Sequence, residues 1–395
     1  MKNKLKLLVL PLAILILVFA CEEHDHEPIS SDDSKPTPPE NIVVTPINGG
    51  FDISYDLPAD NDLLFVKAVY TNSKGEEAEV KTSRYDNKIQ ILGLGDTSEK
   101  TITLYSGDRA ENLSDPVTVK ESPLTPPIYL IQETMEIAQD WGGAKFSWVN
   151  NLKTPVAIEL LAEGNNSEIA LVDTYYTESD SFSASIRGFE AVPTLFAAVI
   201  RDRYDNFSDT IYADTPDKLI TPLHEERLDK TKFVKIVLDN DNDWGRWDNN
   251  YSNFYDDDIE TVVHTQGGEP FPQTLSVDLG QNVILSRIVV NMRRGWPYDH
   301  GNPKKYNLYG AKEFPGTDGN FDNWTLLKEC ESIKPSGLPI GTNTDEDMAH
   351  FEAGDEYTFD EQTEIRYFRF SVTQTWDGAT YVDFAEITFW GNVVD

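Results

Sequence analysis

Short runs in which apolar and polar residues alternate dominate the chain from residue 39 onward. The first of these runs cover residues 42–44, 51–55, 64–70, 89–92 and 101–105, with Gly, Asn, Asp or Pro between them. Strict alternation places the apolar side chains on one face of an extended strand. Repeated strands of this length, separated by turn residues, predict an all-β sandwich.

A sequence repeat divides the first half of the chain. DRAENLSD at residues 108–115 recurs as DRYDNFSD at residues 202–209, each time after a β-rich run. Asn and Asp suit such turns because they tolerate left-handed backbone and hydrogen-bond to their own chain. Prolines cluster at residues 122–127 and 215–222. Together the repeat and the proline clusters predict two domains of similar size, residues 39–123 and 124–222.

Both repeated segments resemble the late-strand turn of fibronectin type III domains, and residues 39–58 are similar to the opening of that family. Tyr55 stands where the family usually has a core tryptophan. The resemblance implies two Ig/fibronectin type III-like sandwiches. Neither contains a catalytic constellation, so we expect both to act as spacers.

Residues 230–395 form a third region, which contains six of the eight tryptophans. Three sets of alternating residues in this region each share one strand face, which predicts a β-sandwich or jelly roll. These sets are Leu275, Val277 and Leu279; Ile288, Val290 and Met292; and Phe368, Phe370 and Val372.

The order of segments in the third region resembles that of discoidin-like domains, the coagulation factor type C fold. The matching pieces are residues 255–261, 277–280, 306–310 with Trp324, and finally 366–370 with 385–391. The family includes many carbohydrate-binding modules. The resemblance therefore implies a discoidin-like jelly-roll β-sandwich of the carbohydrate-binding type.

The same resemblance implies a structural Ca²⁺ site in this region. Calcium takes six to eight oxygen ligands, which a tight acidic turn can supply. Asp256, Asp258 and Thr261 are the expected turn ligands, with Glu386 arriving from the last strand, although Asp257 stands where the family usually has glycine. The alternative is a solvated acidic turn without metal.

Aromatic residues in Gly- and Pro-rich loops of the third region are candidates for sugar contact. A sugar presents an apolar ring face and a rim of hydroxyls, so it needs a flat aromatic platform with planar hydrogen-bonding groups around it. Paired arginines would favour a uronic or sulfated sugar. The candidates are Trp296, Tyr298, Arg293, Arg294 and His300 in one loop, Trp376 in a second, and Trp244 with Trp247 in a third. The alternative is that these rings anchor their loops.

The N-terminus has the layout of a secretory signal. Three lysines precede an apolar run at residues 7–20, and residues 18–21 resemble the bacterial lipobox. The resemblance implies removal of residues 1–20, lipidation at Cys21 and a flexible tether over residues 21–38. The acidic run after Cys21 resembles the surface-export signal of Bacteroidetes lipoproteins, which implies an outer-membrane, lipid-anchored protein facing outward. Plain secretion is the alternative.

Composition argues against nucleic acid as a partner and against intrachain disulfides. The chain has 68 Asp and Glu against 33 Lys and Arg, a formal charge of −35 at pH 7. Such a charge excludes nucleic acid as a partner unless a basic face is segregated, and no basic cluster is present in the sequence. Only Cys330 remains once Cys21 is assigned to lipid, so no intrachain disulfide is expected.

The domain series as a whole looks like lipoproteins encoded with Bacteroidetes polysaccharide-utilisation systems. It predicts a non-catalytic surface protein that captures a polysaccharide or oligosaccharide with its C-terminal domain and touches the membrane only through its anchor. No Gly-x-Ser-x-Gly, His-Glu-x-x-His or Gly-rich phosphate motif is present in the sequence. The expected partners include an outer-membrane transporter complex. The alternatives are a protein-interaction or adhesion scaffold in a glycan-uptake complex, and a glycoside hydrolase accessory enzyme.

Overall fold

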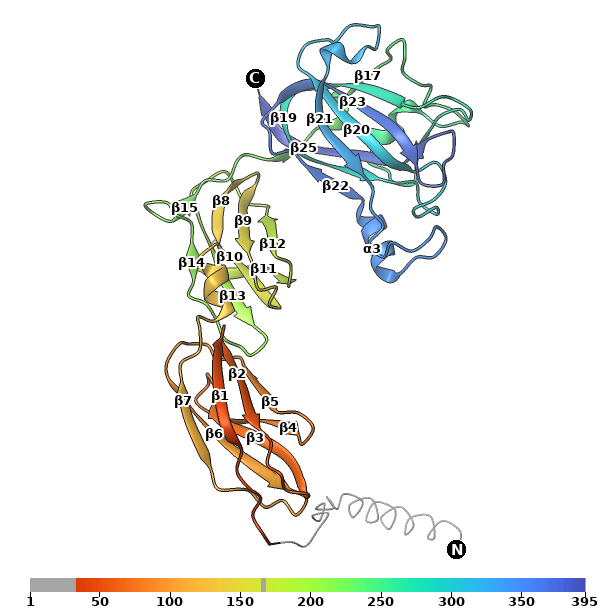
Figure 1. Cartoon of the computed structure of the whole chain (residues 1–395). Helices are drawn as coiled ribbons and strands as arrows, with labels where there is room; N and C mark the ends of the chain where they lie inside the picture. The colour runs from red at the N-terminus through yellow and green to blue at the C-terminus, as the bar shows by residue number, and fades with distance from the viewer. Residues whose placement is uncertain (1–32, 165–167, 395) are drawn as a thin grey trace, which may run out of the picture.

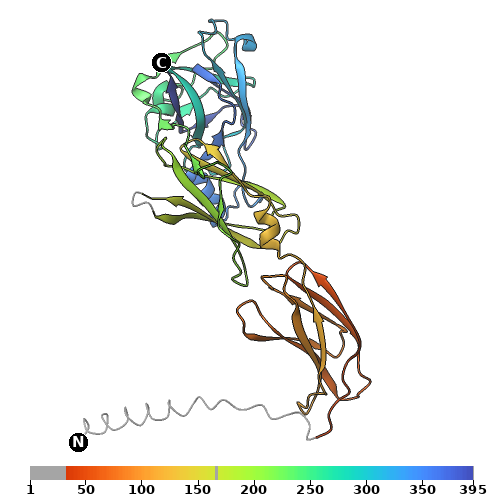
Figure 2. The same ribbon diagram turned by 90° about the vertical axis from the view of Figure 1, so that its left-hand side faces the viewer.

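Three β domains follow one another along an elongated molecule in the computed structural model, which describes residues 33–164 and 168–394 (Figures 1 and 2). Strands provide nearly all the regular structure, and the predicted all-β sandwich class is confirmed. The predicted signal segment and Cys21 lie outside the described residues. No helix in the described part of the chain is long and apolar enough to cross a membrane.

The first domain packs a three-stranded sheet, in the order β1-β2-β5, against a four-stranded sheet, in the order β4-β3-β6-β7. Tyr55 is 2% exposed and lies in the core between the sheets, where the family resemblance placed a tryptophan. The strands are β1 (Glu40–Ile47), β2 (Gly50–Asp56), β3 (Leu63–Thr71), β4 (Glu77–Ser83), β5 (Lys88–Leu92), β6 (Lys100–Asp108) and β7 (Val117–Glu121).

The second domain repeats this arrangement. Its sheets run β12-β9-β8 and β11-β10-β13-β14, with β15 also paired to β13. Trp148 and Phe146 of β9 are buried between them. The elements are α2 (Pro127–Gln132), β8 (Glu136–Asp140), β9 (Gly143–Val149), β10 (Val156–Glu163), β11 (Ile169–Thr177), β12 (Ser181–Ile186), β13 (Thr194–Asp202), β14 (Ile211–Tyr212) and β15 (Leu219–Ile220).

The repeated turn has the same hydrogen bonds in both domains. Asp108 Oδ1 accepts from the backbone N of Asn112 at 2.8 Å, and Asp202 Oδ1 accepts from the backbone N of Asn206 at 3.0 Å. The residue before each Asn has a positive φ, 65° in the first turn and 62° in the second. The Asp and Asn side chains thus hold left-handed backbone in place, as the sequence repeat predicts.

The two linkers leave their sandwiches in the same way. Gly49 N donates to Leu124 O at 3.0 Å, and Gly142 N donates to Leu223 O at 2.8 Å. Both glycines have a positive φ, 66° and 60°, which any other residue would adopt with strain. Each linker leucine therefore forms an isolated parallel β-bridge with the first hairpin of the preceding domain, Leu124 with Asn48 and Leu223 with Trp141.

The C-terminal domain is built around β19, a strand of 19 residues that crosses from one side of the sandwich to the other. Its first half pairs with β23 and its second half with β25. The elements are β16 (Glu226–Arg227), η1 (Lys230–Lys232), β17 (Val234–Ile236), η2 (Tyr251–Tyr255), β18 (Val263–His264), β19 (Gln273–Asn291), β20 (Pro303–Ala311), η3 (Phe321–Asn323), β21 (Thr325–Glu331), α3 (Asp345–Ala353), β22 (Asp355–Thr358), β23 (Glu364–Thr375), β24 (Asp383–Phe384) and β25 (Glu386–Val394).

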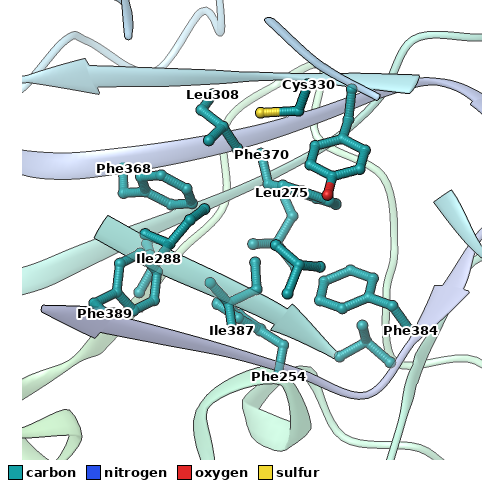
Figure 3. Packing of buried hydrophobic residues seen from close by; sticks show 14 of the residues in the cluster. Phe254, Leu275, Ile288, Leu308, Cys330, Phe368, Phe370, Phe384, Ile387 and Phe389 are labelled. Carbon is teal, nitrogen blue, oxygen red and sulfur yellow. The ribbon is translucent and has the colours of Figure 1, made fainter. Parts of the chain in front are cut away.

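The apolar faces predicted for this domain meet in one large core (Figure 3). All nine residues of the three predicted sets are at most 5% exposed. Phe368 and Phe389 pack edge to face at 4.9 Å between ring centroids, and Phe370 lies 5.0 Å from Phe384. This core fixes the strand ends, and the strand ends in turn position the loops described next.

A buried carboxylate joins the second domain to the third. The Glu225 side chain is 7% exposed, and its Oε1 accepts from Arg187 Nη1 of the second domain at 2.9 Å. The same oxygen accepts from Ser286 Oγ at 2.5 Å and Arg287 Nε at 3.3 Å, both on β19. One side chain thus contacts both domains at their junction.

Candidate functional site

The loop between β19 and β20 is held in shape by Asn302, which is fully buried. Asn302 Oδ1 accepts from Arg293 N at 2.7 Å, and its Nδ2 donates to Trp296 O at 2.8 Å. Its carbonyl accepts from the backbone N of Trp376 at 3.1 Å. The loop is therefore preorganised, and it leaves Trp296 44% exposed.

Asp383 of β24 joins the β19–β20 loop to β18 from the centre of the site. It is fully buried, and its Oδ2 lies 3.0 Å from Arg293 Nη1, 3.0 Å from His300 Nδ1 and 3.4 Å from His264 Nε2. Its other oxygen, Oδ1, has no hydrogen-bond partner among the described residues. A buried carboxylate needs such partners because desolvation of its charge is costly. Asp383 thereby orients both histidine rings.

Five aromatic side chains form a continuous series here, which we call the aromatic row: Trp247, His264, Tyr381, His300 and Trp296. His264 stacks on Tyr381 at 4.9 Å and 16°, and Tyr381 meets His300 at 5.1 Å. His300 stacks on Trp296 at 4.6 Å and 26°, while Trp247 meets His264 edge on at 6.4 Å. Trp247 is 68% exposed at the other end.

Tyr381 fits into the row because residue 301 is a glycine. A Cβ at Gly301 would lie 2.6 Å from the Tyr381 ring. The Tyr381 hydroxyl lies 2.9 Å from His300 Nε2, so the ring is fixed at both its face and its tip. Flat rings with polar atoms at their edges suit the apolar face and hydroxyl rim of a sugar.

Each arginine near the row is ion-paired. Arg293 pairs with Asp383, and Arg294 Nη1 lies 2.6 Å from Glu260 Oε1. Arg246, next to Trp247, lies 3.0 Å from Asp243. The predicted pair Arg293 and Arg294 is thus present beside the row, but neither guanidinium is free.

Two of the predicted sugar-contact residues lie in the core, which contradicts their assignment to an exposed platform. Trp244 is fully buried, and its Nε1 donates to Thr274 O at 2.6 Å. Tyr298 is 2% exposed, because a positive φ of 55° turns it inward, where its hydroxyl donates to Asp347 O at 2.9 Å. Burial raises the pKa of Tyr298 well above its ordinary value.

Trp376 is half-buried rather than displayed at a loop tip. Its ring packs edge to face on Tyr298 at 5.1 Å and borders the main core. Lys304 Nζ lies 4.6 Å from the ring centroid on the β20 side. Trp376 thus anchors its loop against Tyr298 and does not share the surface on which Trp296 is exposed.

Sequence reasoning missed His264, Tyr381 and Asp383. One signal was available for Asp383, since a lone acid between Val382 and Phe384 in an apolar strand end must be paired when buried. For His264 and Tyr381 the signal was weaker. Each lies in a short segment whose place beside the β19–β20 loop depends on long-range strand pairing.

The predicted calcium ligands are not assembled into a metal cluster. Among the described residues, no group of three or more His, Cys, Asp or Glu side chains could hold a metal ion. Asp256 Oδ1 accepts from Asp258 N at 3.0 Å, and its Oδ2 accepts from Thr261 Oγ1 at 2.9 Å. These oxygens are used within the turn itself.

A lysine ammonium occupies the position next to Glu386. Lys230 Nζ lies 2.6 Å from Glu386 Oε1 and 2.7 Å from Asp257 Oδ1, with its side chain only 5% exposed. Asp257 has the positive φ, 66°, expected of the usual glycine, and its N donates to Glu386 Oε2 at 2.9 Å. The residues present therefore bind a lysine cation and do not fit calcium. This corrects the assignment of Asp256, Asp258, Thr261 and Glu386 as metal ligands.

Burial of Glu386 has an electrostatic consequence. Desolvation raises the pKa of Glu386 to about 7, although Lys230 acts in the opposite direction. Asp257 is also desolvated, but the hydrogen bond from Lys230 lowers its pKa below the ordinary value. The turn is thus held by one shared ammonium group.

Three family models match consecutive segments of the chain. Residues 36–123 match a domain of unknown function, DUF4959, residues 124–231 a domain of unknown function, DUF5126, and residues 247–391 a domain of unknown function, DUF5000. No curated protein sequence gives a match.

Solved structures provide further similarities. A SusE-like protein is 30% identical, over 68% of this chain and 100% of its own, with a TM-score of 0.44. The family 32 carbohydrate-binding module of Clostridium perfringens NanJ, solved with galactose, is 20% identical over 42% of this chain and 98% of its own, with a TM-score of 0.31. The C-terminal domain of a Bacteroides fragilis chitobiase is 19% identical over 43% of this chain and 100% of its own, with a TM-score of 0.32. The chain thus carries three consecutive segments that each match a domain family of unknown function, and over 68% of its length it is similar to a SusE-like protein.

Proposed function

We propose that this protein is a non-catalytic glycan-binding protein and that the aromatic row of its C-terminal domain is the binding surface. The observation that carries the proposal is the continuity of the row. Five rings from four segments of the chain contact one another in series, one buried carboxylate orients the two histidines among them, and tryptophans remain exposed at both ends. If the two end tryptophans served only to pack the core, they would be buried as Trp244 and Tyr298 are.

The physical basis for binding is stacking combined with edge hydrogen bonds. The exposed faces of Trp247 and Trp296 can each cover the apolar face of one sugar ring. Between them, the Tyr381 hydroxyl, which pairs with His300 Nε2, has a lone pair left to accept one hydrogen bond from a sugar hydroxyl. Because Asn302 and Asp383 fix the loops beforehand, little conformational entropy is lost on binding.

The test is affinity electrophoresis and calorimetry on a panel of plant and host polysaccharides. We expect Trp247→Ala and Trp296→Ala each to weaken binding by about tenfold, close to 1.4 kcal/mol, because each removes one stacking platform. Tyr85→Ala is the matched control, since Tyr85 is 84% exposed on the first domain. Equal loss in the control, or no retention by any glycan, would contradict the proposal.

The same panel separates binding from hydrolysis. A non-catalytic protein releases no reducing ends from a polymer that it retains. Time-dependent release by the wild-type protein would identify a glycoside hydrolase instead.

Lipid attachment at Cys21, outward display from the outer membrane and contact with a transporter partner are part of the proposal. The signal layout at residues 1–21 supports the anchor. Cys21→Ala should release the protein from the membrane fraction, and protease treatment of whole cells should remove the wild-type protein. Protection of the wild-type protein from external protease would contradict outward display.

A further inference from the structure

The electrostatics of the aromatic row point to the class of glycan that it takes. Resting on the proposed function, we infer that the row selects neutral glycans over uronic or sulfated ones, and that Glu260 sets this specificity by occupying Arg294.

The arginines beside the row are the groups on which an anionic sugar would depend, and carboxylates already hold them. The Arg293–Asp383 pair is fixed from inside, because Asp383 is fully buried and cannot turn away. The Arg294–Glu260 pair lies at the surface, with side chains 48% and 65% exposed. Only the latter pair can be opened without disturbing the core.

Uncompensated acids lie in the same three loops. Asp248 follows Trp247, Asp299 precedes His300, and Asp377 follows Trp376, and none of them forms an ion pair with a described lysine, arginine or histidine. Burial, followed by the charges of Asp383 and Asp377, raises the pKa of Tyr381 in the middle of the row. The potential at the row is therefore negative, in a chain whose formal net charge is −35.

An anionic sugar gains little at such a surface. To reach Arg294 it must displace Glu260, which exchanges one carboxylate–guanidinium pair for another. It must also approach Asp248, Asp299 and Asp377 against their repulsion. Lys304 offers no alternative, because it lies over Trp376, which is outside the row. A neutral sugar avoids both costs and keeps the full stacking contact.

The experiment compares polymers that differ in charge. Affinity electrophoresis is run with polygalacturonate and its methyl ester, with chondroitin sulfate and its desulfated, carboxyl-reduced form, and with xyloglucan, galactomannan and dextran. We expect every retaining polymer to be neutral, with at least about tenfold weaker binding of any charged counterpart. Retention should be unchanged between about 20 mM and 500 mM NaCl, since no charge pair with the ligand is screened.

Two variants test the role of Glu260. Glu260→Gln leaves Arg294 without a carboxylate, so binding of polygalacturonate or chondroitin sulfate should rise by about threefold to tenfold and weaken with salt. Binding of neutral polymers should stay as in the wild type. Glu346→Gln, on the exposed face of α3, changes the net charge equally and should leave all binding unchanged.

The outcomes are distinguishable. Wild-type protein that binds a charged polymer as tightly as its neutral form, with binding lost at high salt, overturns this inference while glycan binding itself stands. An unaltered profile for Glu260→Gln overturns the role of Glu260. Retention by none of the polymers overturns the proposed function, and this inference falls with it.

Discussion

At the scale of single residues, Asp383 decides whether the candidate site is rigid. Its Oδ2 contacts Arg293 and His300 of the β19–β20 loop and His264 of β18, so the loss of one charge loosens both segments at once. No other described acid contacts two members of the aromatic row in this way.

Asp383→Asn should keep the fold and weaken glycan binding. An amide at this position can still accept a hydrogen bond but carries no charge to balance Arg293, so we expect the free energy of unfolding to fall by about 1 to 3 kcal/mol. Glycan affinity should fall by about tenfold or more, because the rings lose their shared orientation. Urea denaturation and calorimetry measure the two effects. Asp322→Asn, exposed in η3, is the control, and equal behaviour of both variants would contradict the role given to Asp383.

The raised pKa of Glu386 predicts a pH dependence of stability. The folded state binds this proton more tightly than the unfolded state, because the pKa is about 7 against an ordinary 4.5. The free energy of unfolding should therefore fall as the pH rises from about 4.5 to about 7, and level off above it.

Glu386→Gln removes this titration and keeps a side-chain oxygen that can accept from Asp257 N. The stability of the wild type relative to this variant should decline between pH 5 and 8 by at most about 3 kcal/mol, at about 1.4 kcal/mol per pKa unit. Urea denaturation of both proteins at the two pH values checks it. A constant or rising difference would show that Glu386 is not desolvated as described.

At the scale of elements, the turn after η2 is organised by Lys230 of η1 instead of a metal ion. The lysine bridges the start of the domain to β25, because its ammonium contacts Asp257 and Glu386 together. The cation that closes this turn therefore belongs to the chain.

Lys230→Met should destabilise the protein by about 3 kcal/mol, since it leaves the buried Glu386 without its partner. The melting temperature of the wild type should be the same in about 1 mM CaCl₂ and in excess EDTA. Lys232→Met is the control, because Lys232 is exposed and its ammonium donates to Gln281 Oε1 at the surface. A melting temperature of the wild type that rises with calcium would contradict this role of Lys230 and support the predicted metal site.

Element-scale features were the most predictable from sequence. The strand faces around Leu275, Ile288 and Phe368 depend on alternation within each strand, and the repeated turn depends on an Asp and an Asn four residues apart. The position of each tryptophan was not predictable in this way. Trp244 and Trp247 are three residues apart in irregular backbone, where no periodicity tells which ring enters the core. The aromatic row depends on the contacts of Tyr381 with His264 and His300, residues far from it in the sequence, which local pattern does not encode.

At the scale of the whole molecule, Glu225 couples the second and third domains. Its carboxylate accepts from Arg187 on one side and from Ser286 and Arg287 on the other. Inter-domain motion is the default unless an interface opposes it, and this buried group provides that opposition.

Glu225→Ala should uncouple these two domains while leaving each folded. We expect a broader distance distribution in small-angle X-ray scattering and faster proteolysis within residues 215–224. The neighbouring Glu226→Ala is the control, because Glu226 is exposed. Scattering curves and cleavage rates identical to wild type would show that the Glu225 contacts do not restrain the junction.

The two linkers also have a consequence for how such a chain changes over generations. Gly49 with Leu124, and Gly142 with Leu223, make the same backbone connection at the exit of each sandwich. Duplicating one sandwich together with its glycine and leucine would also duplicate the backbone hydrogen bond that fixes the linker to the sandwich. The number of N-terminal sandwiches could thus change by gene rearrangement without a new interface having to evolve.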